Sequence, residues 1–111
     1  MQIETRQLPN ILVVDMAGRL DSRSSGAAYD ALVGFGKSGA KKIVLNLRQI
    51  DFVSSAGLRV ILTLAKLLQT SRGEMRICRA NVAVKEMLET SGFNNLIKLF
   101  DDEASALKSW E

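Results

Sequence analysis

The 111-residue chain contains no histidine, one cysteine and one proline. Without histidine it lacks the usual base of a serine triad, a common zinc ligand and the side chain that titrates near neutral pH. The single cysteine, Cys78, excludes an internal disulfide and, with no histidine beside it, argues against a structural zinc site. We therefore expect no metal, no cofactor and no intrinsic enzymatic activity.

Aromatic residues make up only 5% of the chain, and the net charge of +3 comes from scattered cations. Nucleic-acid binding favours clustered cations beside stacking rings, so we expect none. The longest apolar region, 58–68, is interrupted by Arg59 and Lys66 and is too short to cross a bilayer. Residues 1–6 lack the apolar core of a signal peptide. We therefore expect a cytoplasmic protein without membrane insertion. Because the sequence has no heptad repeat, we expect a monomer or weak dimer.

The pattern of apolar and turn-forming residues predicts strands and helices in alternation. The expected strands are 2–7, 11–18, 42–47, 74–79 and a short one within 93–99; the expected helices are 24–35, 56–70, one capped by Asn81, and one starting at 101–103. Pro9 and Asn10 predict a hairpin turn. The order predicts a single α/β domain over residues 1–111, with a mixed sheet of four to five strands and helices mainly on one face.

The stretch 50–58 is the best candidate for a functional site. It joins a predicted buried strand to a long apolar helix through Ser54, Ser55, Ala56 and Gly57. Small side chains there leave the first helical N–H groups accessible, and those groups with the helix dipole favour an anion such as phosphate. A serine at this turn either caps the helix or accepts a phosphoryl group, and the residues alone leave both roles open.

Two other features bear on this turn. A parallel crossover places residues 18–22 and 48–55 at the same end of the sheet. Asp21 is then either the cap of the next helix, a role that Ser22 could also fill, or an acidic group beside the serines. The broad apolar stripe of helix 56–70 is mostly core, and the excess near Leu58, Arg59 and Leu62 suggests a partner surface. The last helix is expected to pack back on the domain through residues 104, 107 and 110.

The chain resembles the STAS domain, named after sulfate transporters and anti-sigma-factor antagonists. The resemblance rests on the order of elements, on residues 18–21 and 43–47, and above all on Ser54-Ser55-Ala56-Gly57-Leu58. Many family members have Asp-Ser-Ser-Gly-Leu or Asp-Ser-Ala-Gly-Leu here, with the acceptor serine after the aspartate. Alignment on the Ala-Gly-Leu segment makes Ser55 the acceptor and Ser54 the second choice, because Ser54 stands where the aspartate usually is.

The resemblance implies an anti-sigma-factor antagonist that works by partner switching. The unmodified protein would bind a serine-kinase anti-sigma factor and free a sigma factor; phosphorylation at Ser55 would release the kinase, and a PP2C-type phosphatase would reset the cycle. The implied partner-binding residues are Asp21, Ser54, Ser55, Ala56, Gly57, Leu58, Arg59 and Leu62. The alternative is a STAS subunit of a transporter or larger signalling complex that binds constitutively, with Ser55 acting only as an N-cap.

Overall fold

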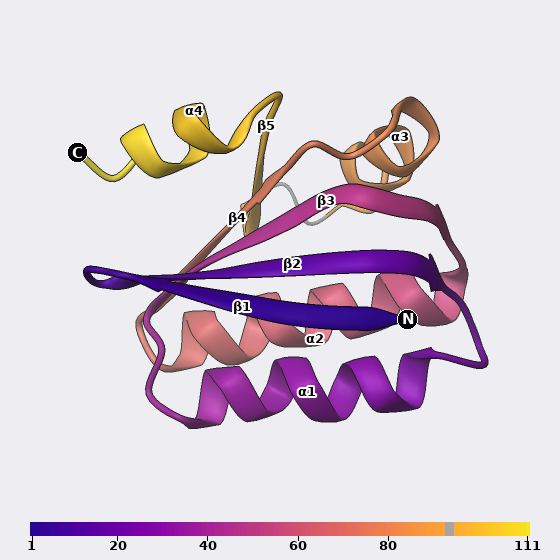
Figure 1. Cartoon of the computed structure of the whole chain (residues 1–111), viewed down its shortest axis with the longest axis horizontal. Coiled ribbons are helices and arrows are strands. Elements are labelled where there is room, and N and C mark those ends of the chain that lie inside the picture. The colour runs from indigo at the N-terminus through magenta and orange to yellow at the C-terminus, as the bar shows by residue number, and fades with distance from the viewer. Residues whose placement is uncertain (93–94) are drawn as a thin grey trace.

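A five-stranded sheet runs through the centre of the molecule, in a computed structural model that describes residues 1–92 and 95–111. In chain order the elements are β1 (Gln2–Leu8), β2 (Ile11–Leu20), α1 (Ser25–Lys37), β3 (Lys42–Val53), α2 (Ser55–Thr70), β4 (Glu74–Cys78), α3 (Val82–Glu89), β5 (Ile97–Phe100) and α4 (Glu103–Lys108). The strands lie in sequence order; β1 is antiparallel to β2, and all later neighbours are parallel (Figure 1). The predicted class, mixed sheet and crossover are confirmed.

The hairpin between β1 and β2 follows from its two turn residues. Proline fixes its own φ, and Asn10 has a φ of 66°, a left-handed conformation that asparagine tolerates better than most residues. The register then continues without interruption from Leu8↔Ile11 to Gln2↔Ala17. The predicted hairpin is therefore confirmed, and β1 lies at the edge of the sheet.

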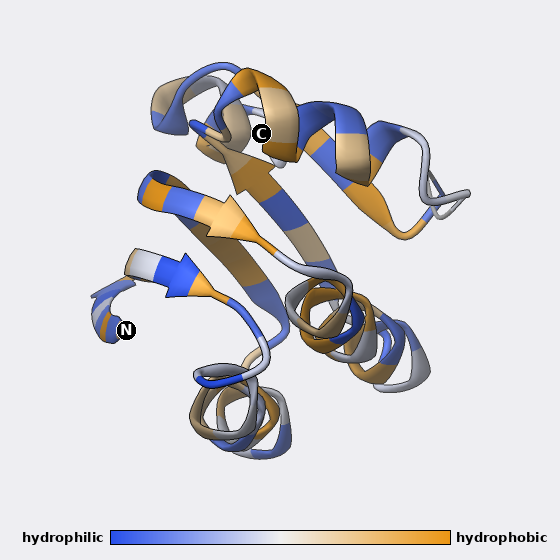
Figure 2. Ribbon diagram, turned by 90° about the vertical axis from the view of Figure 1, so that its right-hand side faces the viewer, coloured by the Kyte–Doolittle hydropathy of each residue, from blue (hydrophilic) through white to orange (hydrophobic). Residues whose placement is uncertain are grey.

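The two faces of the sheet are covered unequally. Figure 2 looks along α1 and α2 and shows both on the same face, where α3 adds Val84 and Leu88 to one large buried cluster. On the opposite face, α4 covers a small cluster of Val13, Val44, Cys78 and Ala106. Burial of one large aliphatic side chain contributes about 1.5–3 kcal/mol, so the larger cluster is the main apolar contribution to stability.

Strands β2 and β3 are longer than the sequence pattern predicts. They pair as far as Leu20↔Val53, through two irregularities in register, instead of ending at residues 18 and 47. Exposed Arg48 and Gln49 interrupt the apolar pattern of β3, but Ile50 beyond them is again buried. The extra residues bring the strand directly to Ser54.

β4 ends at Cys78, one residue early, and β5 occupies 97–100; residues 93 and 94 of the predicted 93–99 strand lie outside the described part.

Two predictions about helix contacts are wrong. The N-cap residue of α1 is Ser24, in place of Asp21 or Ser22, and its side chain makes no capping hydrogen bond. In α4, Ala104 is exposed, and Ala106 is the alanine that faces the sheet. The reason is the side of α4 that faces the sheet: Glu103 is bound there by Arg6, and the residues on its side of the helix are those three, four and seven positions later, 106, 107 and 110. The predicted packing of Leu107 and Trp110 is confirmed.

Candidate functional site

The acceptor turn, Ser54–Ser55, connects β3 directly to α2. Ser54 is the N-cap: its backbone is extended, and its hydroxyl accepts a hydrogen bond from the Gly57 N–H at 3.2 Å. The Ser54 N–H donates to the Leu20 carbonyl at 2.9 Å, which fixes the turn to the end of β2. The Ser54 hydroxyl therefore caps α2, and the interpretation of Ser55 as the N-cap is wrong.

Ser55 is the first residue of α2 and is exposed. Within residues 1–92 and 95–111, no hydrogen bond is assigned to its hydroxyl. The two serines thus have different environments. The Ser54 hydroxyl caps the helix, whereas Ser55 is exposed at the positive end of the helix dipole. Helix α2 has no acidic residue in its first turn, so no carboxylate of the helix itself compensates that end of the dipole.

Gly57 allows α2 to start where it does. A Cβ atom at this position would lie 2.3 Å from the Leu20 carbonyl oxygen and 2.7 Å from the Leu20 Cγ. The helix therefore approaches the backbone of β2 more closely than any side chain permits. The glycine that carries the family resemblance has a packing role here, which the sequence by itself did not distinguish from a functional one.

Asp21 lies in the loop that follows β2, beside the acceptor turn. Its Oδ1 accepts hydrogen bonds from the backbone N–H groups of Arg23 at 3.0 Å and Ser24 at 3.3 Å, and Arg19 Nε lies 3.7 Å from Oδ2. The Arg23 hydrogen bond, then that of Ser24 and the Arg19 charge, lower the pKa of the Asp21 carboxyl below its ordinary value. Asp21 is therefore an anion held by its own loop; among the described residues, no hydrogen bond joins it to Ser54 or Ser55.

The sequence interpretation missed Phe52, which lies two residues before the turn. Its side chain is 41% exposed although it is aromatic, and the Arg19 guanidinium carbon lies 4.5 Å from the ring centroid. A cation over a ring face is favourable and holds the arginine in place. The available signal was the alternation of β3: buried Val53 next to the turn implies that its neighbour Phe52 points to the other side.

Two surface hollows flank the acceptor turn. One, of about 320 Å³, runs along α2 and is lined by Ser55, Leu58, Arg59, Leu62, Thr63 and Lys66. The other, of about 470 Å³, is lined by Met1, Arg19, Asp21, Arg23, Ser24 and Ala27. The structure therefore brings the predicted residues Ser55, Leu58, Arg59 and Leu62 onto one surface, while Gly57 is buried beneath it and Ala56 is half-buried.

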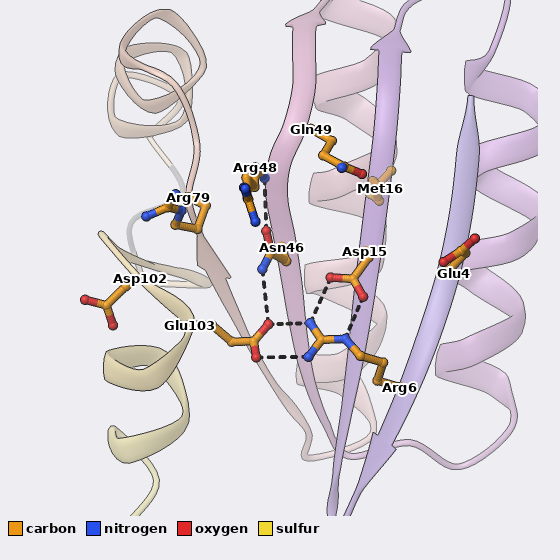
Figure 3. A pocket seen from close by; sticks show the side chains of 10 residues that line it. All are labelled: Glu4, Arg6, Asp15, Met16, Asn46, Arg48, Gln49, Arg79, Asp102 and Glu103. Atoms are coloured by element: carbon orange, nitrogen blue, oxygen red, sulfur yellow. Dashed lines mark hydrogen bonds and ion pairs between the residues drawn. The ribbon is translucent and has the colours of Figure 1, made fainter.

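A third hollow, of about 530 Å³, lies on the sheet face that α1 and α2 leave open (Figure 3). At its centre is the Arg6 cluster, which consists of Arg6, Asp15, Asn46 and Glu103. Arg6 forms a two-point ion pair with Asp15, at 2.7 and 2.8 Å, and a second one with Glu103. The Asn46 side-chain amide donates to Glu103 at 3.1 Å and its oxygen accepts from the Arg48 N–H. The cluster joins α4 to three strands, and its cation is already paired.

Neither a metal site nor a membrane span is found in the described part of the chain. Residues 1–92 and 95–111 hold no group of three or more potential metal ligands. Helices in the same ranges are too short or too polar to cross a bilayer.

Comparison with known proteins gives a consistent result. A family model described as the STAS domain matches residues 2–106. The chain is 32% identical to an anti-sigma F factor antagonist of Paenibacillus polymyxa, over all of this chain and 96% of the relative. Its fold is similar to an anti-sigma factor antagonist from Mycobacterium paratuberculosis, with a TM-score of 0.87, 18% identity and coverage of 97% and 92%. It is also similar to the phosphorylated form of the Bacillus cell fate determinant SpoIIAA, with a TM-score of 0.77, 16% identity and coverage of 99% and 100%.

Proposed function

Because this chain belongs to the STAS domain family, we propose that it is an anti-sigma-factor antagonist whose binding is controlled by phosphorylation of Ser55. The unmodified form binds a serine-kinase anti-sigma factor and so frees a sigma factor. Phosphorylation releases the kinase, and a PP2C-type phosphatase restores the binding form. The name of the Paenibacillus relative and the existence of a phosphorylated SpoIIAA structure support this proposal. The protein acts as substrate and ligand in the cytoplasm and carries no catalytic residue.

The observation that carries the proposal is the difference between the two serine hydroxyls. Ser54 Oγ accepts the Gly57 N–H, whereas Ser55 is exposed at the start of α2, on the same surface as Arg59 and Leu62. A kinase needs a hydroxyl that reaches its bound nucleotide without unfolding the substrate. Ser55 meets that requirement, and modification of Ser54 would disrupt the helix cap.

In the transfer, Ser55 Oγ attacks the γ-phosphorus of ATP bound to the kinase. The new bond joins Oγ to phosphorus, the bond from the γ-phosphorus to the bridging oxygen breaks, ADP leaves, and the serine proton passes to a base of the kinase. Asp21 stays ionised because hydrogen bonds from its own loop lower the pKa of its carboxyl. A carboxylate with a lowered pKa is a poor proton acceptor, so we assign Asp21 to setting the local charge beside the turn.

Phosphate at Ser55 adds about −1.5 to −2 charges and three acceptor oxygens. The N-terminus of α2 tolerates that charge, so the fold persists. A partner that covers the acceptor turn does not tolerate it, since an unmatched buried charge costs several kcal/mol. Each ~1.4 kcal/mol changes affinity tenfold, which predicts a loss of roughly a hundredfold on phosphorylation.

The test is to incubate the chain with its cognate kinase and ATP and to map phosphate by mass spectrometry. We expect phosphate on Ser55 and loss of kinase binding in the modified product. Phosphate on Ser54 alone would refute the alignment on Ala56-Gly57-Leu58. A chain that stays unmodified and binds its partner regardless of a charge at Ser55 would favour the constitutive STAS subunit.

A further inference from the structure

Arg59 and Ser55 lie one helical turn apart on α2. Residues four apart occupy the same face of a helix, with Cβ atoms about 5–6 Å from each other. Both side chains are exposed, and both line the hollow of about 320 Å³ along α2. In the ranges 1–92 and 95–111, no ion pair or side-chain hydrogen bond is assigned to Arg59. Its positive charge is therefore uncommitted and within reach of whatever Ser55 carries.

The other cations near the turn are less suited to that position. Lys66 is eleven residues from Ser55, about 16 Å along the helix at 1.5 Å per residue, which is beyond direct contact. Arg19 is held over the Phe52 ring and beside Asp21. Arg23 lines the hollow that also contains Asp21, and it does not line the hollow along α2 that Ser55 and Arg59 share.

We propose that Arg59 changes its ion-pair partner when Ser55 is phosphorylated. It binds a carboxylate of the partner protein when Ser55 is unmodified, and it pairs with the phosphate of its own chain when Ser55 is phosphorylated. The inference rests on the proposed phosphorylation of Ser55. A negative group four residues N-terminal to a cation is the favourable order in a helix. Arginine also forms two parallel hydrogen bonds to a phosphate, which a lysine does not.

Phosphorylation then acts on the partner surface in two ways. It places a charge in the interface, and it withdraws the cation that the partner needs. Because the second effect passes through Arg59, removing this side chain weakens binding of the unmodified form and also removes that part of the further loss caused by phosphate. The two changes are therefore not additive, as is usual for groups in direct contact.

The test uses the whole chain with phosphoserine incorporated at position 55 during translation, so that no kinase is required. The second pKa of the phosphate, ordinarily about 6, is followed by phosphorus NMR titration. A nearby cation favours the dianion and lowers that pKa. We expect Arg59→Gln to raise it by roughly half a unit, and Arg59→Lys to raise it by less. The matched control is Arg48→Gln, which removes the same charge on the opposite face of the sheet.

Equal titration of the parent and Arg59→Gln proteins would overturn the cis pair. An equal shift in Arg48→Gln would overturn it as well, because the effect would then be one of overall charge. This result is separate from the fate of the proposed function: failure of the kinase to modify Ser55 contradicts that function and leaves the phosphate titration unchanged.

Discussion

At the scale of single residues, adjacent serines have different roles because the helix begins between them. Ser54 is outside the helix with an extended backbone, so its hydroxyl bonds back to Gly57. Ser55 is inside the helix and exposed. One step along the chain thus decides which residue caps the helix and which is exposed at its first turn. In family members with aspartate at the first position, a carboxylate would occupy the place of Ser54, and aspartate is an equally good N-cap.

The two serines should respond differently to substitution by alanine. Ser54→Ala removes the helix cap and should lower the free energy of unfolding by about 1 kcal/mol, while Ser55 still accepts phosphate. Ser55→Ala should change stability by less than ~0.5 kcal/mol and abolish phosphorylation, leaving the protein permanently competent to bind. Urea unfolding and kinase assays of both variants test this pair, each serving as the control for the other. The reverse pattern would exchange the two roles.

Asp21→Asn keeps the shape of the loop and much of its hydrogen bonding but removes the charge. We expect slower phosphorylation or weaker partner binding, with little change in melting temperature, because the half-buried Asp21 carboxyl contributes mainly local charge. Since its pKa is lowered by the Arg23 hydrogen bond, any contribution of the carboxylate is present at neutral pH and is lost as pH falls through its folded-state value, below 3.8. Loss of folding with unchanged phosphorylation kinetics would assign Asp21 a structural role only.

At the scale of elements, the start of α2 is set by its contact with β2. The helix N-terminus packs against the backbone at Leu20, and Gly57 provides the room for it. The same Leu20 carbonyl accepts the Ser54 N–H, so strand end, turn and helix start form one unit. This unit fixes where α2 begins, and Ser55 is its first residue.

Gly57→Ala should destabilise the fold by about 1–3 kcal/mol, because its Cβ would overlap the Leu20 carbonyl and the helix has to move. The matched control is Gly34→Ala in α1, where a Cβ meets no atom within 4 Å. Alanine there should stabilise the protein by roughly 0.5–1 kcal/mol through helix propensity. Chemical denaturation of both variants measures the difference, and equal effects would contradict the packing role of Gly57.

Helix α4 is held to the sheet by the Arg6 cluster as well as by its apolar contacts. The Arg6 hydrogen bonds, with a smaller contribution from Asn46, lower the pKa of Glu103 below its ordinary 4.5. A carboxyl with a lowered folded-state pKa stabilises the fold above its unfolded pKa, and this contribution is lost as pH falls through the folded value. The attachment of α4 should therefore weaken only in acid, below about pH 4.5.

Cys78 provides a reporter for that attachment, since it is buried under α4 and burial raises the pKa of its thiol to about 12. Glu103→Gln should increase the rate of thiol labelling at neutral pH several-fold and flatten the acid limb of the stability curve. Glu89→Gln, an exposed carboxylate on α3, is the control. Unchanged labelling in Glu103→Gln would show that the apolar contacts of Ala106 and Leu107 hold α4 without the cluster.

At the scale of the whole molecule, the sheet separates the partner surface from the Arg6 cluster. The acceptor turn lies at the carboxyl ends of β2 and β3 with α1 and α2 behind it, while α4 and the Arg6 cluster occupy the opposite face. The charge that we propose at Ser55 would therefore lie at an exposed turn, outside the buried core of the fold.

Ser55→Asp should imitate the released state incompletely, because aspartate carries less charge than a phosphate. We expect at least a tenfold loss of affinity for the cognate kinase, with a melting temperature within about 2 °C of the parent protein. Titration calorimetry and thermal unfolding measure the two quantities on the same sample. Binding as tight as that of the parent, with the fold intact, would contradict control by charge at Ser55.

The sequence by itself determined the fold class, the hairpin at Pro9–Asn10 and the stretch that contains the site. These features depend on local chemistry: turn conformations, apolar periodicity and small residues at a strand-to-helix junction. What only the tertiary structure decided were contacts between distant segments. The Leu20 carbonyl settles the role of Gly57, and the pairing of β2 with β3 carries the strand past Arg48 to Ser54. The Arg6–Glu103 pair joins residues 97 positions apart, a separation over which no local pattern specifies a partner.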